Sequence, residues 1–306
     1  MFAFSTCWNS DRHIDGAAML HEIVGMGFLN VELSHGIRVS LIEGIQKARE
    51  KDPRIRVVSL HNYCPLPVGY IRSAPNVHIL SSERESERAR AVRATIATMD
   101  FAEKMGARHI VLHMGRVRMT DPVEPLLASV AAGKRDTPGH RALVEQARKQ
   151  RDAKGSGAFS RAMKSLAVLV EEARLRNLVL GVESRARLDE VPSESELERM
   201  LAEFSPEHLG YWHDTGHVQM WENLGLADHV AWLRKFQGRL VGAHLHDVIW
   251  PEDDHQLPGD GSVPFDQLAA SLRADIPKIF EIHPGIPSEV IPGRLAPLIK
   301  KLATAP

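Results

Sequence analysis

Short apolar runs alternate with longer amphipathic stretches along the whole chain. The short runs are rich in Val, Ile, Leu and Phe and end at polar residues, which is typical of strands buried on both faces of a parallel sheet. The stretches between them repeat apolar residues every three or four positions, as amphipathic helices do. We therefore predict eight strands, at residues 2–6, 30–33, 56–60, 109–112, 179–182, 210–212, 241–243 and 279–280.

Local signals mark the ends of some of the predicted helices. An apolar helical face from Val92 to Met105 is followed by Gly106, a residue suited to the left-handed position just beyond a helix C-terminus. Ser193 and Glu196 have the spacing of a capping box, which predicts that a helix begins there after the fifth strand.

Eight strand-helix units with right-handed crossovers predict a single α/β domain over residues 1–306, folded as a (β/α)8 TIM barrel. The first predicted strand is not followed by a Gly-rich dinucleotide-binding loop, which favours the barrel over a doubly wound sheet. Residues 116–157 are longer than a barrel unit needs, so we predict an insertion after the fourth strand that ends in an extended helix. This insertion forms either a lid or interface over the site, or a solvated surface excursion.

Composition narrows the class of protein only slightly. The 306 residues are 43% hydrophobic and carry a formal net charge of −1, so no global basic field points to a nucleic acid. Cys7 and Cys64 are too few for a disulfide framework, and we expect reduced thiols. Neither a secretory signal nor a run of 18 apolar residues is recognisable, so we expect a cytoplasmic protein without a membrane span.

Metal-ligating residue types stand at the carboxyl ends of six successive predicted strands. They are His61, His113, Glu183, Asp214, His244 and Glu281. The last four are separated by 31, 30 and 37 residues, which is one strand-helix unit each time. Because sequential strands are neighbours in a barrel, we expect these four side chains to converge at one mouth. His217 adds a further candidate at the same rim, as do Asp253 and His255 in the loop predicted after the seventh strand, before a helix that begins near Pro264.

A lone His or Asp at a strand end is usually a hydrogen-bonded structural residue or a helix cap. Nine candidates at the same ends of six consecutive strands are not explained by core packing, which would place Val, Ile or Leu there. We therefore predict a site for a divalent metal. Imidazole and carboxylate ligands without thiolate suit zinc, manganese or cobalt better than calcium or copper(I).

Several motifs of the chain resemble a known family. The stretches GARHIVLHMG, GVESR, HDTGH and HLHD, followed by DDHQLPGDG, resemble the xylose isomerase-like TIM barrels, which include sugar and sugar-phosphate isomerases and epimerases together with endonuclease IV-type apurinic endonucleases. For the epimerase branch the resemblance implies one metal held by Glu183, Asp214, His244 and Glu281, with His217 near the substrate. For the endonuclease branch it implies three zinc ions on nine ligands: these four and His61, His113, His217, Asp253 and His255.

The leading hypothesis is isomerisation or epimerisation of a sugar, sugar phosphate or related polyol. In it Glu183 and Glu281 transfer the proton next to the substrate carbonyl through a metal-stabilised enediolate, which His217 orients or stabilises. Substrate-binding candidates are Glu32, Arg185, His61 and His113, and a surface salt bridge is an equal alternative for Glu32 and Arg185. The expected partner is a small carbohydrate, and a homo-oligomer is compatible with the fold.

Two other classes stay open at this point. The first is hydrolysis of the phosphodiester at an abasic site with up to three zinc ions. The stretch NYCPLPVGY after His61, and the acidic run Trp250–Asp253, replace the DNA-contacting loop and basic residues of that branch, so a nucleic acid is the less favoured partner. The second is a sugar-binding or metal-storing barrel without catalysis, which complete carboxylate ligands disfavour.

Overall fold

The structure, a computed structural model, describes residues 1–70, 72 and 75–304. Within these residues eight parallel strands close into a barrel in the order β1-β10-β7-β6-β5-β4-β3-β2. The barrel strands are β1 Phe2–Ser5, β2 Asn30–Leu33, β3 Arg56–His61, β4 His109–Leu112, β5 Val179–Glu183, β6 Leu209–Asp214, β7 Leu240–Leu245 and β10 Lys278–Phe280. The predicted (β/α)8 barrel is confirmed, with strand ends that differ from the prediction by at most two residues.

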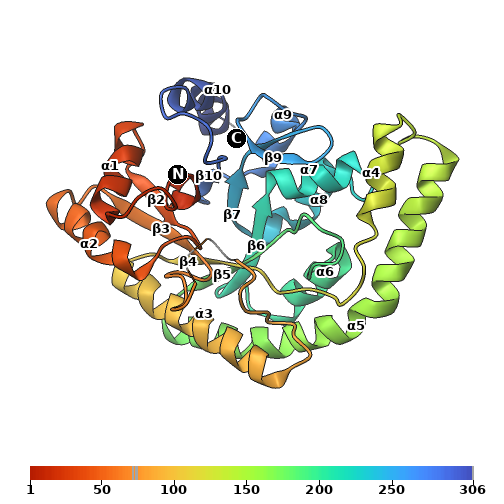
Figure 1. Ribbon diagram of the computed structural model, residues 1–306, viewed down its shortest axis with the longest axis horizontal. Coiled ribbons are helices and arrows are strands. Elements are labelled where there is room, and N and C mark those ends of the chain that lie inside the picture. The colour runs from red at the N-terminus through yellow and green to blue at the C-terminus, as the bar shows by residue number, and fades with distance from the viewer. Residues whose placement is uncertain (71, 73–74, 305–306) are drawn as a thin grey trace.

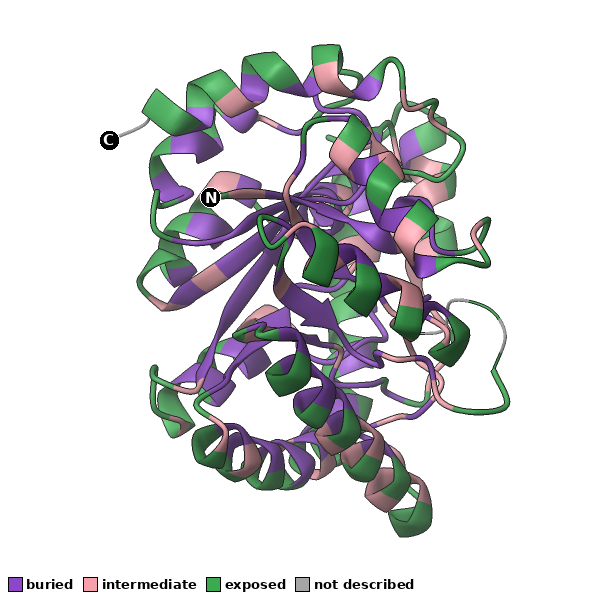
Figure 2. Cartoon of the chain, turned by 90° about the vertical axis from the view of Figure 1, so that its left-hand side faces the viewer, coloured by how far each residue is buried: buried purple, intermediate pink, exposed green. Residues whose placement is uncertain are grey.

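Helices surround the barrel, and α3 and α5 lie side by side along one part of it (Figure 1). The helices are α1 Gly16–Gly25, α2 Ile42–Lys51, α3 Glu85–Met105, α4 Val123–Ala131, α5 Pro138–Leu175, α6 Glu194–Glu203, α7 Thr215–Asn223, α8 His229–Phe236, α9 Phe265–Leu268 and α10 Ile291–Thr304. Figure 2 shows the buried strands at the centre and the exposed outer faces of the helices. Among the described residues, no helix is long and apolar enough to cross a bilayer.

The local helix signals have their expected roles. Gly106 follows α3 with φ +67°, in the left-handed region that glycine adopts without strain. Ser193 Oγ accepts the N–H of Glu196, and the Glu196 carboxylate accepts the N–H of Ser193, so α6 begins with the predicted capping box.

The predicted insertion, residues 116–157, contains α4 and the first part of α5. With 38 residues at 1.5 Å per residue, α5 is about 57 Å long. Arg135 donates to the Asn223 carbonyl over 3.0 Å, Arg148 donates to the Leu226 carbonyl over 2.6 Å, and the buried Arg151 donates to Glu196 over 2.7 Å. The predicted insertion is thus hydrogen-bonded to α6, to the last residue of α7 and to the loop after α7, and its role as a lid, an interface or a surface excursion stays a prediction.

The segment after β7, which we predicted to be a loop, forms a β-hairpin. We expected irregular structure after the seventh strand, but β8 Asp247–Ile249 and β9 Asp253–Gln256 pair antiparallel there. The physical reason is Asp247, whose carboxylate accepts the N–H groups of Val248, Gly259 and Val263 over 2.8–2.9 Å and closes the segment on itself. The helix expected near Pro264 is α9, a single short turn.

A tryptophan fills the barrel interior beneath the strand ends. A small apolar cluster of Ala3, Val111, Trp212 and Ile279 occupies this layer. Room for the Trp212 ring comes from neighbouring glycines, because a Cβ at Gly242 would lie 2.1 Å from the ring and one at Gly181 would lie 2.8 Å from it. Since side chains two positions apart on a strand share one face, the residues above this layer point into the mouth of the barrel.

Candidate metal centre and active site

Four predicted ligands converge at the carboxyl ends of β5, β6, β7 and β10. Glu183, Asp214, His244 and Glu281 are buried, and one ligand atom of each lies within 4.8 Å of the others. His244 Nδ1 lies 2.7 Å from Glu183 Oε1, 3.0 Å from Glu281 Oε2 and 3.6 Å from Asp214 Oδ2. The ring of Trp212 closes the site from below, with its centroid 5.3 Å from that of His244.

The donor set of this cluster fits a divalent cation. Three carboxylates and one imidazole face the same small volume, and burying several carboxylates together is unfavourable unless a cation compensates their charge. Asp214 Oδ2 is buried and has no hydrogen-bond partner within the described chain, although Asp214 Oδ1 accepts the N–H of His217 over 2.8 Å. Burial, only partly offset by His244 and His255, raises the pKa of the Glu281 carboxyl. A bound cation would give Asp214 Oδ2 a partner and would stabilise the ionised form of Glu281.

The imidazole of His244 is oriented from behind by Glu32. His244 Nε2 lies 3.1 and 3.2 Å from the two oxygens of Glu32, whose carboxylate also accepts the hydroxyls of Ser5 over 3.0 Å and Ser59 over 2.7 Å. Burial lowers the pKa of His244, but Glu281 and Glu32 raise it well above its ordinary value. Glu32 is fully buried, so a surface salt bridge is ruled out, and its position beneath His244 suits orientation of a ligand better than contact with a substrate.

On the other side of the cluster, the guanidinium of Arg185 holds Glu183 in place. Arg185 contacts Glu183 Oε2 through Nη1, which lies 2.6 Å from His113 Nε2, and its Nη2 donates to Glu190 over 3.1 Å. Burial raises the pKa of Glu183, but Arg185 and His113 outweigh it and hold that pKa well below its usual range. His61 lies slightly farther away, with Nε2 4.0 Å from Glu183 Oε2.

A second group of histidines borders Asp214. His217 Nδ1 donates to the Ser184 carbonyl over 2.9 Å, and its ring centroid lies 6.4 Å from that of His255. Although burial lowers the pKa of His255, its hydrogen bond to Asp254 and nearby carboxylates raise it to about 9. His255 therefore brings a positive charge to the rim of the mouth. His246 stacks against His255 with centroids 4.3 Å apart and donates to Asp214 Oδ1 over 2.9 Å.

Sequence reasoning and structure differ at a few residues of the rim. The structure places Asp253 away from the cluster, on the exposed edge of the hairpin, where it accepts a hydrogen bond from Gln256 over 3.0 Å. His246, Glu190 and Asp254 were not predicted to belong to the site. The alternation of His244 and His246 in the HLHD motif was a usable signal for His246, whereas the sequence contained none for Glu190.

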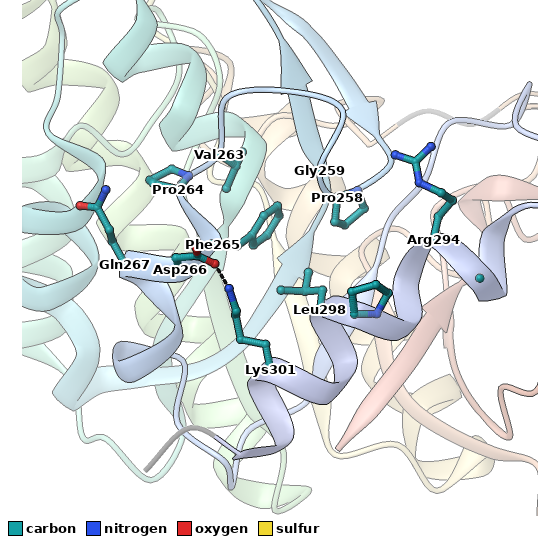
Figure 3. A pocket seen from close by; sticks show the side chains of 12 residues that line it. Pro258, Gly259, Val263, Pro264, Phe265, Asp266, Gln267, Arg294, Leu298 and Lys301 are labelled. Carbon is teal, nitrogen blue, oxygen red and sulfur yellow. Dashed lines mark ion pairs between the residues drawn. The ribbon is translucent and has the colours of Figure 1, made fainter.

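Figure 3 shows a cavity of about 590 Å³ between α9 and α10, away from these ligands. Val263, Phe265 and Leu298 line its apolar part, and its cations are paired, Arg294 with Asp260 and Lys301 with Asp266. Its described lining residues include no member of the metal-ligand cluster.

Comparisons with known proteins agree with this fold. The chain is 16% identical to a D-tagatose 3-epimerase-like protein of known structure, with a TM-score of 0.70 over 98% of this chain and 97% of the other. It is 10% identical to the IOLI protein, solved with a bound zinc atom, with a TM-score of 0.63 over 99% of this chain and 98% of the other. A curated relative, the uncharacterized protein y4fM of Sinorhizobium fredii, is 27% identical over 99 residues, which are 32% of this chain and only 30% of that protein.

A family model described as xylose isomerase-like TIM barrel matches residues 22–286. This range includes seven of the eight barrel strands and all four residues of the ligand cluster. The chain therefore belongs to the xylose isomerase-like TIM barrel family.

Proposed function

We propose that this chain is a divalent-metal-dependent isomerase or epimerase of a sugar, sugar phosphate or related polyol. The observation that carries the proposal is the convergence of Glu183, Asp214, His244 and Glu281 at the mouth of the barrel, where Asp214 Oδ2 is buried and has no hydrogen bond among the described residues. In (β/α)8 enzymes the carboxyl ends of the strands form the active site. The likeness to a D-tagatose 3-epimerase-like protein and to a zinc-bound IOLI protein supports this choice of chemistry.

The four clustered residues would hold the metal. A divalent cation there supplies Lewis-acid polarisation of a substrate carbonyl and a chelating point for two neighbouring oxygens. The part played by the protein is to keep the ligands in place: Glu32 orients His244, and Arg185 orients Glu183.

Proton transfer is assigned to the two glutamates at opposite sides of the cluster. Glu281, whose pKa burial raises, is suited to accept the proton from the carbon next to the carbonyl and to return it. Glu183 serves the opposite face, although Arg185 keeps its pKa low and makes it the weaker base. His217 and the positive His255 face negative charge that develops on the substrate oxygen.

Phosphodiester hydrolysis at an abasic site is less well supported. The resemblance implies nine metal ligands for that activity, and one of them, Asp253, lies away from the other candidate ligands on the exposed edge of the hairpin. Glu252, just before it in the hairpin, is exposed as well, and this acidic edge would repel a nucleic-acid backbone.

The test is hydrogen exchange on a panel of substrates. Protein loaded with zinc or manganese is incubated in D2O with ketoses, aldoses and their phosphates, and deuterium next to the carbonyl is followed by NMR. We expect deuterium incorporation together with a second sugar for at least one substrate, and neither with chelator-stripped protein. No exchange on any substrate, with cleavage of an abasic duplex by the same preparation, would support the phosphodiesterase instead.

A further inference from the structure

The metal ligands of the mouth form three overlapping groups among the described residues. One is the cluster of four described above. The others are His61, His113 and Glu183, which share Glu183 with it, and Asp214, His217 and His246, which share Asp214. Residue types alone would therefore allow up to three ions, and the hydrogen bonds within the two outer groups decide whether those groups are free to bind metal.

In the group with Glu183, a guanidinium already occupies the position of a cation. Nη1 of the buried Arg185 contacts Glu183 Oε2 and lies 2.6 Å from His113 Nε2, and these two atoms are only 2.7 Å apart. A metal bound to both would have to lie about 2.0–2.2 Å from each, in the space that the guanidinium fills. Glu190 fixes Arg185 from the other side over 3.1 Å, so the guanidinium is anchored at both ends.

The hydrogen bonds of the two histidines agree with this arrangement. His113 Nδ1 lies 3.3 Å from Asn76 Oδ1, and His113 Nε2 lies 2.6 Å from Arg185 Nη1 and 2.7 Å from Glu183 Oε2, so both ring nitrogens already have partners. His61 Nδ1 donates to the Asn62 carbonyl over 3.1 Å, and His61 Nε2 stays 4.0 Å from Glu183. His61 Nε2 therefore lies nearest to a carboxylate oxygen whose charge Arg185 already compensates.

In the group with Asp214, the candidate ligand His246 is used internally. His246 Nδ1 accepts the backbone N–H of His255 over 2.9 Å. The ring proton of His246 therefore lies on Nε2, which donates to Asp214 Oδ1 over 2.9 Å. Both ring nitrogens of His246 are engaged. Asp253, which would be needed to complete a site with His217 and His255, faces solvent beside Gln256.

We propose that Arg185 takes the place of a second metal ion and thereby restricts the centre to one divalent cation. This inference rests on the proposed metal centre and adds that Glu183 binds metal through Oε1 alone, because Oε2 belongs to Arg185. A glutamate held in this way does not bridge two ions. Arg185 is then a positioning residue that sets the nuclearity of the centre, and with it the class of chemistry that the site supports.

The experiment measures metal content, not turnover. Wild type, Arg185→Ala and Arg185→Gln are equilibrated with Zn²⁺ or Mn²⁺, freed of unbound metal by gel filtration and analysed for ions per chain, and folding is checked by circular dichroism. Arg187→Ala is the matched control, because Arg187 is an exposed arginine that pairs with Asp121 and Asp189. We expect one ion per chain in wild type and in the control, and two in the Arg185 variants, with a return to one in Arg185→Ala combined with His113→Ala.

Two results would overturn the proposal. One is a wild type that binds two or three ions per chain, and the other is folded Arg185 variants that still bind one. Arg185→Lys, which keeps the positive charge, is expected to remain at one ion. Electron paramagnetic resonance of Mn²⁺ gives an independent reading, since two neighbouring ions couple and a single ion does not. Sugar turnover enters none of these readouts, so an inactive protein with one ion would refute the proposed function and leave this inference standing.

Discussion

Replacement of Glu32 by Gln tests whether the negative charge beside His244 strengthens metal binding. The substitution keeps the shape of the side chain and removes its charge. Serine hydroxyls can accept as well as donate, so Ser5 and Ser59 can reorient around the new amide, and the amide oxygen can still accept the N–H of His244. The change therefore isolates the effect of the negative charge on His244.

The expected magnitude follows from the geometry. Both oxygens of Glu32 lie within 3.2 Å of His244 Nε2, and the whole arrangement is buried, where charges are weakly screened. Loss of a carboxylate that supports a ligating histidine typically weakens metal binding by about 10–100-fold. That corresponds to about 1.4–2.8 kcal/mol of binding free energy.

The assay is competition for Zn²⁺ with a chromophoric chelator near neutral pH. Glu43→Gln is the control, since Glu43 is exposed and pairs with Lys47 on the same helix, and it should bind metal as wild type does. Equal affinities for Glu32→Gln and wild type would refute the reasoning that Glu32 makes His244 a better ligand.

Three further predictions concern catalysis and stability. Glu281→Gln should lower the rate of substrate deuterium exchange by about 10²–10⁴-fold because it removes the proton carrier, and exchange within tenfold of wild type would point to another base. Removal of metal with a chelator, from a starting concentration about 100 times Kd, should lower the free energy of unfolding by about 2.7 kcal/mol and Tm by about 4 °C, and an unchanged Tm would argue against a native metal. Arg151→Met should lower the free energy of unfolding, measured in urea, by about 3–5 kcal/mol, because it leaves the buried Glu196 carboxylate without its cationic partner. The control Lys149→Met, which removes an exposed ion pair, should change that free energy by about 0.5 kcal/mol or less. A loss for Arg151→Met no larger than that of the control would contradict the account.

The sequence predicts the barrel and the cluster of four ligands for one shared reason. Consecutive strands of a closed parallel barrel are neighbours, so a residue such as Asp214 at one strand end must lie beside His244 at the next. No knowledge of side-chain conformation is needed for that step. The same rule explains why Glu183 and Glu281, at the ends of β5 and β10, are found in the group.

What the sequence does not predict is how the remaining polar side chains pair. Arg185 and Glu190 lie on an irregular loop, and their meeting with His113 depends on the path of that loop. The hairpin turns Asp253 outward, where it accepts a hydrogen bond from Gln256. Both are contacts between segments without a regular period, for which the spacing of residues gives no constraint.

The most direct test of the metal centre is a crystal of the zinc-loaded protein measured at the zinc absorption edge. We expect one anomalous peak in each chain, surrounded by Glu183, Asp214, His244 and Glu281. A lack of anomalous density there, or a stronger peak between His61 and His113, would contradict the central claim.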